Sequence, residues 1–435
     1  MRGSNLVPPP AGCTAYLDGI RLQRFRSLQD TGLIRLRPLM LLIGQNSSGK
    51  SSFLRFFPLI RQTEAANAAS PLLWFGEDVD LGDFSRVCMR GAASRSIQVD
   101  LRFALRKHRS PEDVPDFSLL VSSTLEERGA QTVVTRCQVE IADLSYQLSF
   151  GNDGVLMSAR MGEEELLGAP VRAWAGEPIS LVPSLSLILG PNADMDVPEL
   201  SALRRWLELA ERGFVRLADS THYSGPVRQG PARFYRKQEL RSSQMDPAGA
   251  NMAAFLLHLE RSEQDAFSRW AHEHFGFEVR IRAEGTLNYE IEIIEKGQAY
   301  NLIDMGYGFS QVLPLIIQSW ASAQRGRPRT PTVLAVEQPE LHLHPRYQAL
   351  LADMLVDLLA GLQGTASDAP PRILVETHSE ALINRIGELI ANGRLAPRDV
   401  LVLLFEKDGG ISRVREAEFT QEGFLRDWPI GFFAP

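Results

Sequence analysis

The stretch Gly44-Gln-Asn-Ser-Ser-Gly-Lys-Ser51 is the part of this 435-residue chain from which its fold class follows. It matches GxxxxGK[ST], the P-loop pattern, at every fixed position. The apolar run 40–43 precedes it and predicts a strand, and 52–57 predicts the first turns of a helix. This strand–loop–helix order aims backbone N–H groups and a helix N-terminus at a phosphate chain. The sequence therefore predicts a nucleoside triphosphate site.

Two side chains of the P-loop have defined tasks. Lys50 would reach the β- and γ-phosphates, and the Ser51 hydroxyl would ligate Mg²⁺. The residues predicted to cradle the phosphates are Gly44, Gln45, Asn46, Ser47, Ser48, Gly49, Lys50, Ser51 and Ser52.

The bulk composition is that of a globular protein, with 44% hydrophobic and 23% charged residues. The net charge of −7 means that the whole chain does not attract nucleic acid, so any DNA contact would need a local basic patch. Most basic clusters are solvated surface. The candidate clusters are Arg102, Arg106, Lys107 and Arg109, and Arg233, Arg236, Lys237 and Arg241.

The cysteine content points to a reducing compartment. Cys13, Cys88 and Cys137 form an odd and sparse set, which argues against a disulfide framework. No apolar run approaches the length of about eighteen residues that a membrane-spanning helix requires. We therefore expect a cytoplasmic protein without membrane contact.

The pattern of apolar residues changes along the chain, which predicts an α/β fold of several parts. From 96 to about 160 it alternates with period two, as in antiparallel strands, and 198–212 has helical period. No heptad repeat extends over several turns, so no long coiled coil is expected. We expect a disordered leader at 1–14, an N-terminal lobe with the P-loop and an antiparallel β region at 15–165, a helical insertion at 166–278, a C-terminal ATPase lobe at 279–400 and a tail domain at 401–435.

Three later stretches supply the rest of a nucleotide site. The apolar run 332–336 ends in Glu337, the Walker B form, which delivers a carboxylate to Mg²⁺ at the carboxyl edge of a parallel sheet. The stretch 304–311, Asp-Met-Gly-Tyr-Gly-Phe-Ser-Gln, predicts a second anion-binding element at a helix start. The stretch 375–379, Val-Glu-Thr-His-Ser, would place His378 at the same sheet edge as a γ-phosphate sensor.

The order of these motifs resembles that of the ABC-type ATPase heads, with a mixed or parallel Walker sheet. This group includes SMC proteins, RecF and the OLD (overcoming lysogenization defect) family. The pattern is most similar to short bacterial "AAA family" ATPases of the OLD/RecF-like group, often found in phage-defence operons. Three further stretches fit that subgroup: 25–27, 223–235, and 428–433, which reads Trp-Pro-Ile-Gly-Phe-Phe, as in a small C-terminal domain of unknown function.

The resemblance implies roles for the matching residues. Two protomers would pack head-to-tail around two ATP molecules, so that ATP acts as a dimerisation switch. Glu337 would bind Mg²⁺ and His378 would read the γ-phosphate, while Arg26 would lie near the base or sugar. The residues that would cap the γ-phosphate from the other subunit are Gly306, Gly308, Ser310 and Gln311.

One position departs from the pattern of these heads. The residue after the Walker B acid is normally a catalytic glutamate, and here it is Gln338. An amide orients water but does not accept its proton. Glu340 could serve instead if the loop bends inward. We therefore predict slow hydrolysis and long-lived ATP-bound dimers.

Several functions remain open at this point. The first is an ATP-dependent switch for a separately encoded effector, such as a nuclease in phage defence. The second is a RecF-like DNA-binding repair ATPase, and the third is a scaffold in which ATP is structural. A nuclease within the chain would depend on Asp194 and Asp196.

Overall fold

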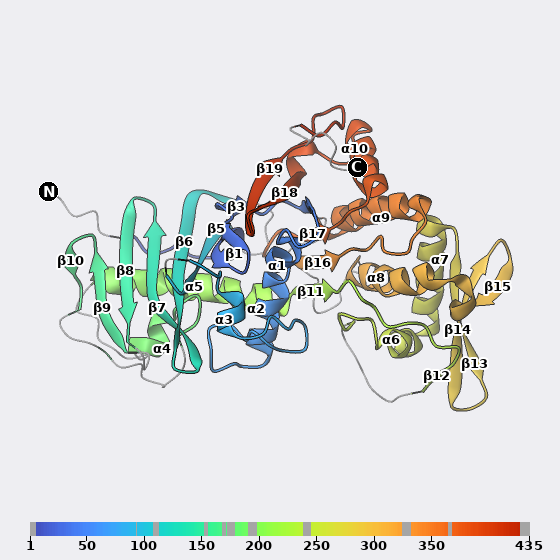
Figure 1. Cartoon of the computed structure of the whole chain (residues 1–435), viewed down its shortest axis with the longest axis horizontal. Coiled ribbons are helices and arrows are strands. Elements are labelled where there is room, and N and C mark those ends of the chain that lie inside the picture. Colours follow the sequence, from blue (N-terminus) through green and yellow to red (C-terminus); the bar gives the residue numbers. More distant parts are fainter. Residues whose placement is uncertain are drawn as a thin grey trace.

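A computed structural model shows a mixed α/β protein built around one large mixed sheet and one small antiparallel sheet (Figure 1). It confirms the predicted fold class. The structure describes residues 6–92, 94–107, 113–151, 155–167, 171, 179–189, 198–237, 245–323, 332–363 and 368–426.

The parallel part of the large sheet has the strand order β18-β4-β17-β16-β11. The strand that leads into the P-loop, β4, and the Walker B strand, β16, are therefore separated by β17. The strands are β4 (Leu39–Gly44), β11 (Thr221–Ser224), β16 (Val333–Glu337), β17 (Arg372–Glu376) and β18 (Val400–Asp408).

Alternate residues of β4 enter two different hydrophobic cores. Met40 and Leu42 lie in one core with the helices that follow the P-loop, whereas Leu39 and Leu41 lie in the other, with the C-terminal helices. The sheet is thus covered on both faces, as the near-continuous apolar run of β4 predicts. The helices on the two faces are α1 (Lys50–Leu54), α2 (Phe56–Ala65) and α5 (Pro198–Asp219), and α8 (Tyr307–Ala323), α9 (Pro345–Gln363) and α10 (Glu380–Ala391).

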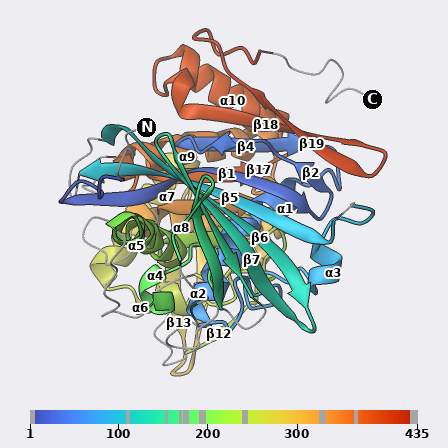
Figure 2. The ribbon, with the colours of Figure 1, turned by 90° about the vertical axis from the view of Figure 1, so that its left-hand side faces the viewer.

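The largely antiparallel part continues the same sheet in the order β10-β9-β8-β7-β6-β5-β1-β2-β19, with β3 paired to β1 and with β2 and β19 paired in parallel. Figure 2 shows these strands fanning out with strong twist, and α5 lying against them. The strands are β1 (Cys13–Phe25), β2 (Leu28–Asp30), β3 (Ile34–Arg35), β5 (Ser96–Lys107), β6 (Asp113–Arg128), β7 (Gln131–Ile141), β8 (Leu144–Phe150), β9 (Leu156–Met161), β10 (Glu164–Glu165) and β19 (Ile411–Ala417).

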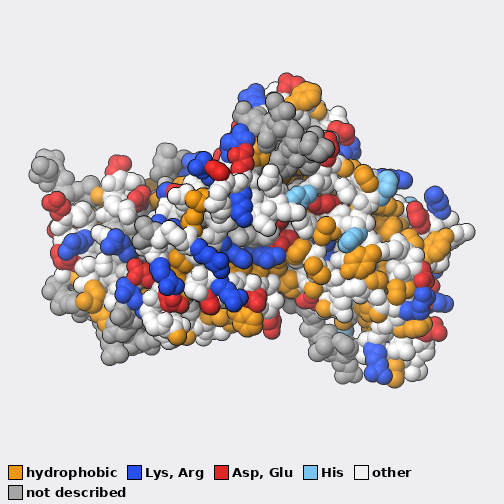
Figure 3. Space-filling model, viewed as in Figure 1, with side chains coloured by type: hydrophobic (Ala, Val, Ile, Leu, Met, Phe, Trp, Pro, Cys, Tyr) orange, Lys and Arg blue, Asp and Glu red, His pale blue; other side chains and the backbone are white. Residues whose placement is uncertain are grey.

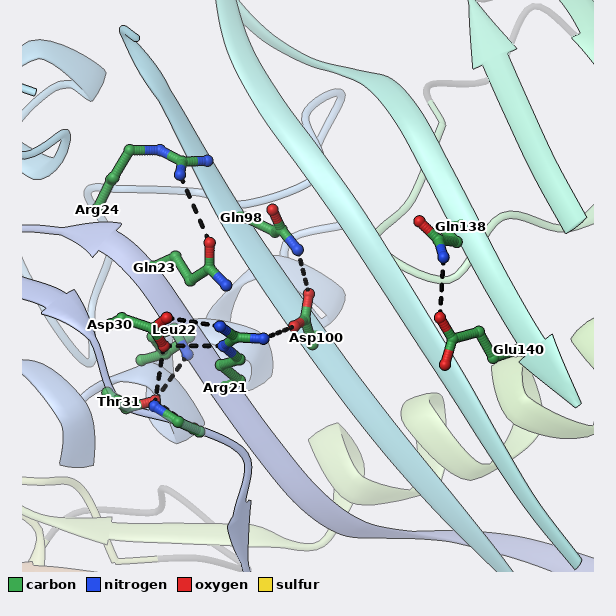
Figure 4. A network of polar contacts seen from close by, with 11 residues as sticks. Arg21, Leu22, Gln23, Arg24, Asp30, Thr31, Gln98, Asp100, Gln138 and Glu140 are labelled. Carbon is green, nitrogen blue, oxygen red and sulfur yellow. Dashed lines mark hydrogen bonds and ion pairs between the residues drawn. The ribbon is translucent and has the colours of Figure 1, made fainter. Parts of the chain in front are cut away.

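Polar side chains connect three strands of this part. Arg21 on β1 donates two hydrogen bonds to Asp30 on β2, at 2.8 and 2.5 Å, and lies 3.7 Å from Asp100 on β5 (Figure 4). Gln98 donates to the same Asp100. The contacts of Arg21 bridge neighbouring strands and so favour a single register.

The small sheet has the order β12-β14-β13, with β15 paired to β14, and packs with helices at the end of the molecule opposite the antiparallel part (Figure 1). Its elements are β12 (Tyr235–Arg236), β13 (Glu278–Glu284), β14 (Asn288–Glu295), β15 (Gln298–Asn301), α6 (Met252–His258) and α7 (Arg261–Phe275). The remaining short helices are α3 (Phe84–Val87), α4 (Leu185–Leu189), η1 (Leu302–Met305) and η2 (Pro397–Asp399).

Two predicted domain assignments are wrong. The insertion at 166–278 is not purely helical, because β11 pairs in parallel with β16 and forms the edge of the Walker sheet. The boundary at 400/401 falls within β18, which pairs with β4, so this segment belongs to the central sheet. Local periodicity could not reveal either fact, because both depend on pairing between distant strands.

Helix boundaries also differ from expectation. The end of the predicted helical insertion at 166–278 contains two separate helices, α6 and α7, since Glu260 and Glu263 form a capping box that starts α7. The predicted stretch 428–433 and the pair Asp194 and Asp196 lie outside the described residues, as do Arg109 and Arg241. None of the helices in the described part of the chain combines the length and apolar character needed to cross a membrane.

Candidate nucleotide site

The P-loop links β4 to α1 and depends on two glycines for different reasons. A Cβ on Gly44 would lie 2.3 Å from the Phe405 carbonyl oxygen, so β18 approaches too closely for a side chain. Gly49 has a φ of 100°, in the left-handed region that glycine alone occupies readily. Between them, Gln45, Asn46 and Ser47 are exposed, whereas Ser48 is buried.

Lys50 lies folded back over the loop. Its Nζ donates to the carbonyl oxygens of Gly44, at 2.9 Å, and Gln45, at 2.8 Å, and lies 3.9 Å from the Glu376 carboxylate. Burial lowers the pKa of Lys50, and the nearby carboxylates of Glu376 and Glu340 oppose that shift. A buried ammonium held by two carbonyls is well placed to move onto an anion that enters the loop.

Glu337 ends β16 as predicted, but its carboxylate is already engaged. Arg55, which joins α1 to α2, donates to both oxygens, at 2.7 and 2.8 Å, and the Tyr223 hydroxyl donates to one of them at 2.7 Å. Arg228 reaches the backbone oxygen of Glu337 at 3.3 Å. The stretch that contains Tyr223 and Arg228 thus surrounds the Walker B residue.

The surroundings of Glu337 are strongly desolvated. Burial raises the pKa of the Tyr223 hydroxyl and lowers the pKa of Arg228 to about 10. The hydrogen bonds to Glu337 raise the pKa of Arg55. Sequence reasoning assigned no role to Arg55 or Tyr223, because neither belongs to a motif with a known task, although Tyr223 lies in a stretch that carries the resemblance.

Glu376 is a site residue that sequence reasoning missed. It ends β17 directly opposite Glu337, and one of its oxygens faces Lys50. Burial and then the charge on Glu337 raise the pKa of Glu376 to about 7, against a hydrogen bond from Ser51 and the charge on Lys50. The sequence does contain a signal for Glu376. Glu337 was identified because it ends an apolar run, and the run 372–376 ends in an acid in the same way.

Gln338, Glu340 and His378 lie together at the carboxyl edge of the sheet. Gln338 has a φ of 43° and donates its backbone N–H to the backbone oxygen of Glu376. One Glu340 oxygen accepts the backbone N–H of His378 at 2.6 Å, so the loop does bend inward. Burial raises the pKa of Glu340, and burial and then the charge on Lys50 lower the pKa of His378, which favours a neutral imidazole.

The stretch predicted to be a second anion-binding element begins α8. Gly306 has a φ of 84° and is exposed, and a Cβ on Gly308 would lie 2.4 Å from the His342 carbonyl oxygen. The buried Ser310 hydroxyl donates to the Tyr307 carbonyl oxygen. Gln311 exchanges two hydrogen bonds with the backbone of Arg228, both at 3.1 Å, and so ties this helix to the segment after β11.

Arg26 lies at the end of β1 with a φ of 55°. Burial lowers the pKa of Arg26, and the charge on Arg55 lowers it further. Figure 3 shows Lys and Arg side chains gathered across the middle of this face, over the region of α1 and α3. A polyanion is the class of ligand that such a surface attracts.

Several buried polar atoms of this region have no hydrogen-bond partner among the described residues: Ser48 Oγ, Glu340 Oε2, Glu376 Oε2 and His378 Nε2. Each such atom costs about 1–3 kcal/mol when left unpaired. Their grouping around Lys50 fits a phosphate chain with a divalent cation, because hydroxyl and imidazole groups bind phosphate oxygens and carboxylate oxygens bind Mg²⁺. No cluster of three or more His, Cys, Asp or Glu among the described residues forms a metal site.

One family model matches part of the chain. Residues 255–383 match the model of a family described as AAA ATPase domain. The matched segment contains α8, β16 and β17 but not the P-loop, which the fold brings alongside through β4. A comparison with curated proteins finds no significant match.

The chain is also similar to solved structures of Smc heads. One is the SMC head domain from Thermotoga maritima, with 12% identity, 92% of this chain and 98% of that chain covered, and a TM-score of 0.40. Another is an Smc head domain with an extended coiled coil bound to the C-terminal domain of ScpA, derived from Pyrococcus furiosus, with 10% identity, coverage of 93% and 96%, and a TM-score of 0.42. These scores mark a loose similarity and add nothing to what the geometry of the site itself supports.

Proposed function

We propose that this protein binds and slowly hydrolyses ATP, and that ATP-dependent self-association of two copies switches a partner protein. The observation that carries the proposal is the convergence at one sheet edge of Lys50, Glu337 and Glu376. Among the described residues Lys50 contacts two backbone carbonyls and a distant carboxylate, so a phosphate can replace these partners. The AAA ATPase match over 255–383 supports the same chemistry.

The binding step uses residues of the P-loop. Lys50 would move from the carbonyls of Gly44 and Gln45 to the β- and γ-phosphates, and the Ser51 hydroxyl would help to hold Mg²⁺. The cation neutralises charge on the phosphates when it is bound. The half-buried His378, with one unpaired ring nitrogen, would contact the γ-phosphate.

The hydrolytic step would be slow because the residue after the Walker B acid is an amide. Gln338 can orient a water but cannot take its proton. Glu340 is the available carboxylate, yet one of its oxygens is tied to the backbone of His378. We expect Glu340→Gln to reduce turnover without weakening ATP binding, whereas unchanged turnover would exclude Glu340 as the base.

Self-association would complete the site. Gly306 and Tyr307, at the start of α8, are exposed, and Tyr307 leaves 49% of its surface open to solvent. In a head-to-tail pair this element, with Gly308, Ser310 and Gln311, would approach the γ-phosphate bound by the other copy. ATP would then bind the paired state better than the single chain, which is the requirement for a switch.

The partner is proposed to be a separately encoded effector, such as a nuclease in bacterial phage defence, acting in the cytoplasm. This part rests on the resemblance of the motif order to the OLD/RecF-like group. A duplex-binding role is less favoured, since Arg233 and Arg102 of the candidate basic clusters are paired with Asp304 and Asp18, respectively.

Nucleotide binding and oligomeric state test the proposal together. Titration calorimetry with ATP and Mg²⁺, followed by light scattering with and without ATP, should show binding and a doubling of mass. Lys50→Ala should weaken ATP binding at least about 100-fold and abolish the change in mass. A Lys50→Ala protein that binds ATP and assembles like the unaltered protein would exclude the switch.

A further inference from the structure

Glu376 occupies the position between the P-loop and the Walker B residue. Its strand, β17, pairs in parallel with β4 on one side and β16 on the other, which sets Glu376 opposite Leu42 and Glu337. Thr377, the next residue, donates its backbone N–H to the Leu42 carbonyl oxygen at 3.1 Å. This bond extends the strand pairing toward the end of β4, where the P-loop begins. Glu376 is therefore the strand-end carboxylate next to Lys50 and Ser51.

The two carboxylates differ in how much of their binding capacity is already used. Glu337 accepts two hydrogen bonds from Arg55 and one from Tyr223. Glu376 has one oxygen 3.9 Å from Lys50, and its other oxygen is buried without a hydrogen-bond partner. The P-loop hydroxyl of Ser51 lowers the pKa of Glu376 and so opposes the rise that burial causes.

Cation binding favours the carboxylate with free lone pairs. Mg²⁺ uses one or two carboxylates together with substrate phosphates, and it requires oxygen atoms at near-ideal octahedral positions. Glu337 already uses three of its roughly four lone-pair sites, and two of them bind the Arg55 guanidinium, whose positive charge would repel a cation on the same carboxylate. Glu376 needs to give up only its long contact with Lys50, which a bound phosphate would draw away.

We propose that Glu376, with the Ser51 hydroxyl, supplies the protein ligands to the divalent cation that accompanies ATP. Glu337 then remains paired with Arg55 and acts as a positioning residue that holds the end of β16 and the Tyr223 segment together. This inference rests on the proposed function, and it replaces the sequence-based expectation that Glu337 carries the cation.

The experiment separates nucleotide binding from cation binding. The affinity for a non-hydrolysable β,γ-imido ATP analogue is measured in EDTA and in Mg²⁺. The affinity of Mn²⁺ for the protein–analogue complex is measured by water-proton relaxation. The variants are Glu376→Gln and Glu337→Gln, which make the same chemical change on neighbouring strands. Lys50→Ala serves as the control for the proposed function.

We expect Glu376→Gln to bind the analogue in EDTA like the unaltered protein but to lose at least about tenfold in Mn²⁺ affinity. Glu337→Gln should retain Mn²⁺ affinity within about threefold. If Glu376→Gln also loses binding in EDTA, Glu376→Asp replaces it, because this variant keeps the charge near Lys50 and moves only the oxygens. For Glu376→Asp we then expect weaker Mn²⁺ binding and an unchanged affinity for the analogue in EDTA.

Three results would overturn the assignment. They are loss of Mn²⁺ affinity in Glu337→Gln alone, equal loss in both glutamine variants, and full retention in the Glu376 variants. Failure of the proposed function looks different, because the unaltered protein would then bind no analogue, or Lys50→Ala would bind it equally well in both buffers.

Discussion

The charged side chains at the ends of β16 and β17 differ from those that join β1, β2 and β5, although both groups belong to one continuous sheet. Arg21 and Asp30 leave 35% and 40% of their side chains exposed and form two hydrogen bonds, which lower the pKa of Asp30 (Figure 4). Glu337 and Glu376 are only 2% and 4% exposed, and burial raises the pKa of Glu376.

The difference shows what each group of charges does for the protein. Exposed charges with complete pairing cost little and help to hold strands in register. Buried charges with incomplete pairing oppose folding, so they persist where a ligand completes their contacts. Matched substitutions in the two regions test this contrast.

The largest effect is expected when the Arg55–Glu337 pair is broken. Arg55→Ala leaves the Glu337 carboxylate buried with only the Tyr223 hydroxyl, so the free energy of unfolding should fall by about 3 kcal/mol. Urea denaturation without nucleotide measures this change. Arg21→Ala is the matched change in the antiparallel part. If Arg55→Ala lowers the free energy of unfolding by no more than Arg21→Ala does, the contrast between the two regions is wrong.

Glu376→Gln should stabilise the nucleotide-free protein at high pH. The folded-state pKa is raised from 4.5 to about 7, so ionisation opposes folding. The penalty is absent below about pH 4.5 and complete above about pH 7. The free energy of unfolding of the variant should therefore exceed that of the unaltered protein by on the order of 2 kcal/mol at about pH 8, with no difference near pH 4.5.

Urea denaturation of both proteins across this pH range is the measurement. An Asp30→Asn variant is the control, and its change in the free energy of unfolding should have the opposite sign. The folded-state pKa of Asp30 is lowered, so ionisation of Asp30 favours folding at pH values above its pKa in the unfolded chain. A constant difference between Glu376→Gln and the unaltered protein at every pH would contradict a raised pKa.

Gly308→Ala should disturb the contact between α8 and the loop after β16. Its Cβ would lie 2.4 Å from the His342 carbonyl oxygen, so the two segments must separate, at a cost of about 1–3 kcal/mol. Gly361→Ala in α9 is the matched control, because its Cβ meets nothing within 4 Å. The free energy of unfolding of that variant should rise by about 0.5–1 kcal/mol, because alanine has a higher helix propensity than glycine. Thermal unfolding distinguishes the two signs.

The smallest effect is expected from Arg21→Ala. The exposed pair with Asp30 should contribute less than about 1 kcal/mol, and less still in high salt. Denaturation at low and high ionic strength measures it. A loss that is large and independent of salt would mean that the buried Asp100, 3.7 Å from Arg21, dominates the network.

Much of the architecture could be predicted from local patterns. The strand before the P-loop and the run 332–336 that ends in Glu337 were expected almost at their observed bounds, because four or five consecutive apolar residues before a loop residue favour a buried strand. The residues of the nucleotide site that sequence reasoning named and that the structure brings together at one edge are Lys50, Glu337, Gln338, Glu340 and His378. Their roles in catalysis remain predictions.

Other features could not be predicted because they depend on contacts between distant segments. β11 belongs to the Walker sheet through its pairing with β16, more than a hundred residues away in the chain. Gln311 was expected to face the nucleotide, but its amide is bonded to the backbone of Arg228. A residue type and its spacing do not specify which of several neighbours it meets.

The residues of the P-loop and the acid Glu337 at the end of an apolar run were enough to indicate a phosphate site at a sheet edge, because strand–loop–helix geometry and runs of apolar residues are local properties. Which acid is free to bind a cation was a matter for the tertiary structure. Arg55, Tyr223 and Glu337 come from three distant segments, and their meeting occupies one carboxylate and leaves the other, Glu376, with an unpaired oxygen beside Lys50.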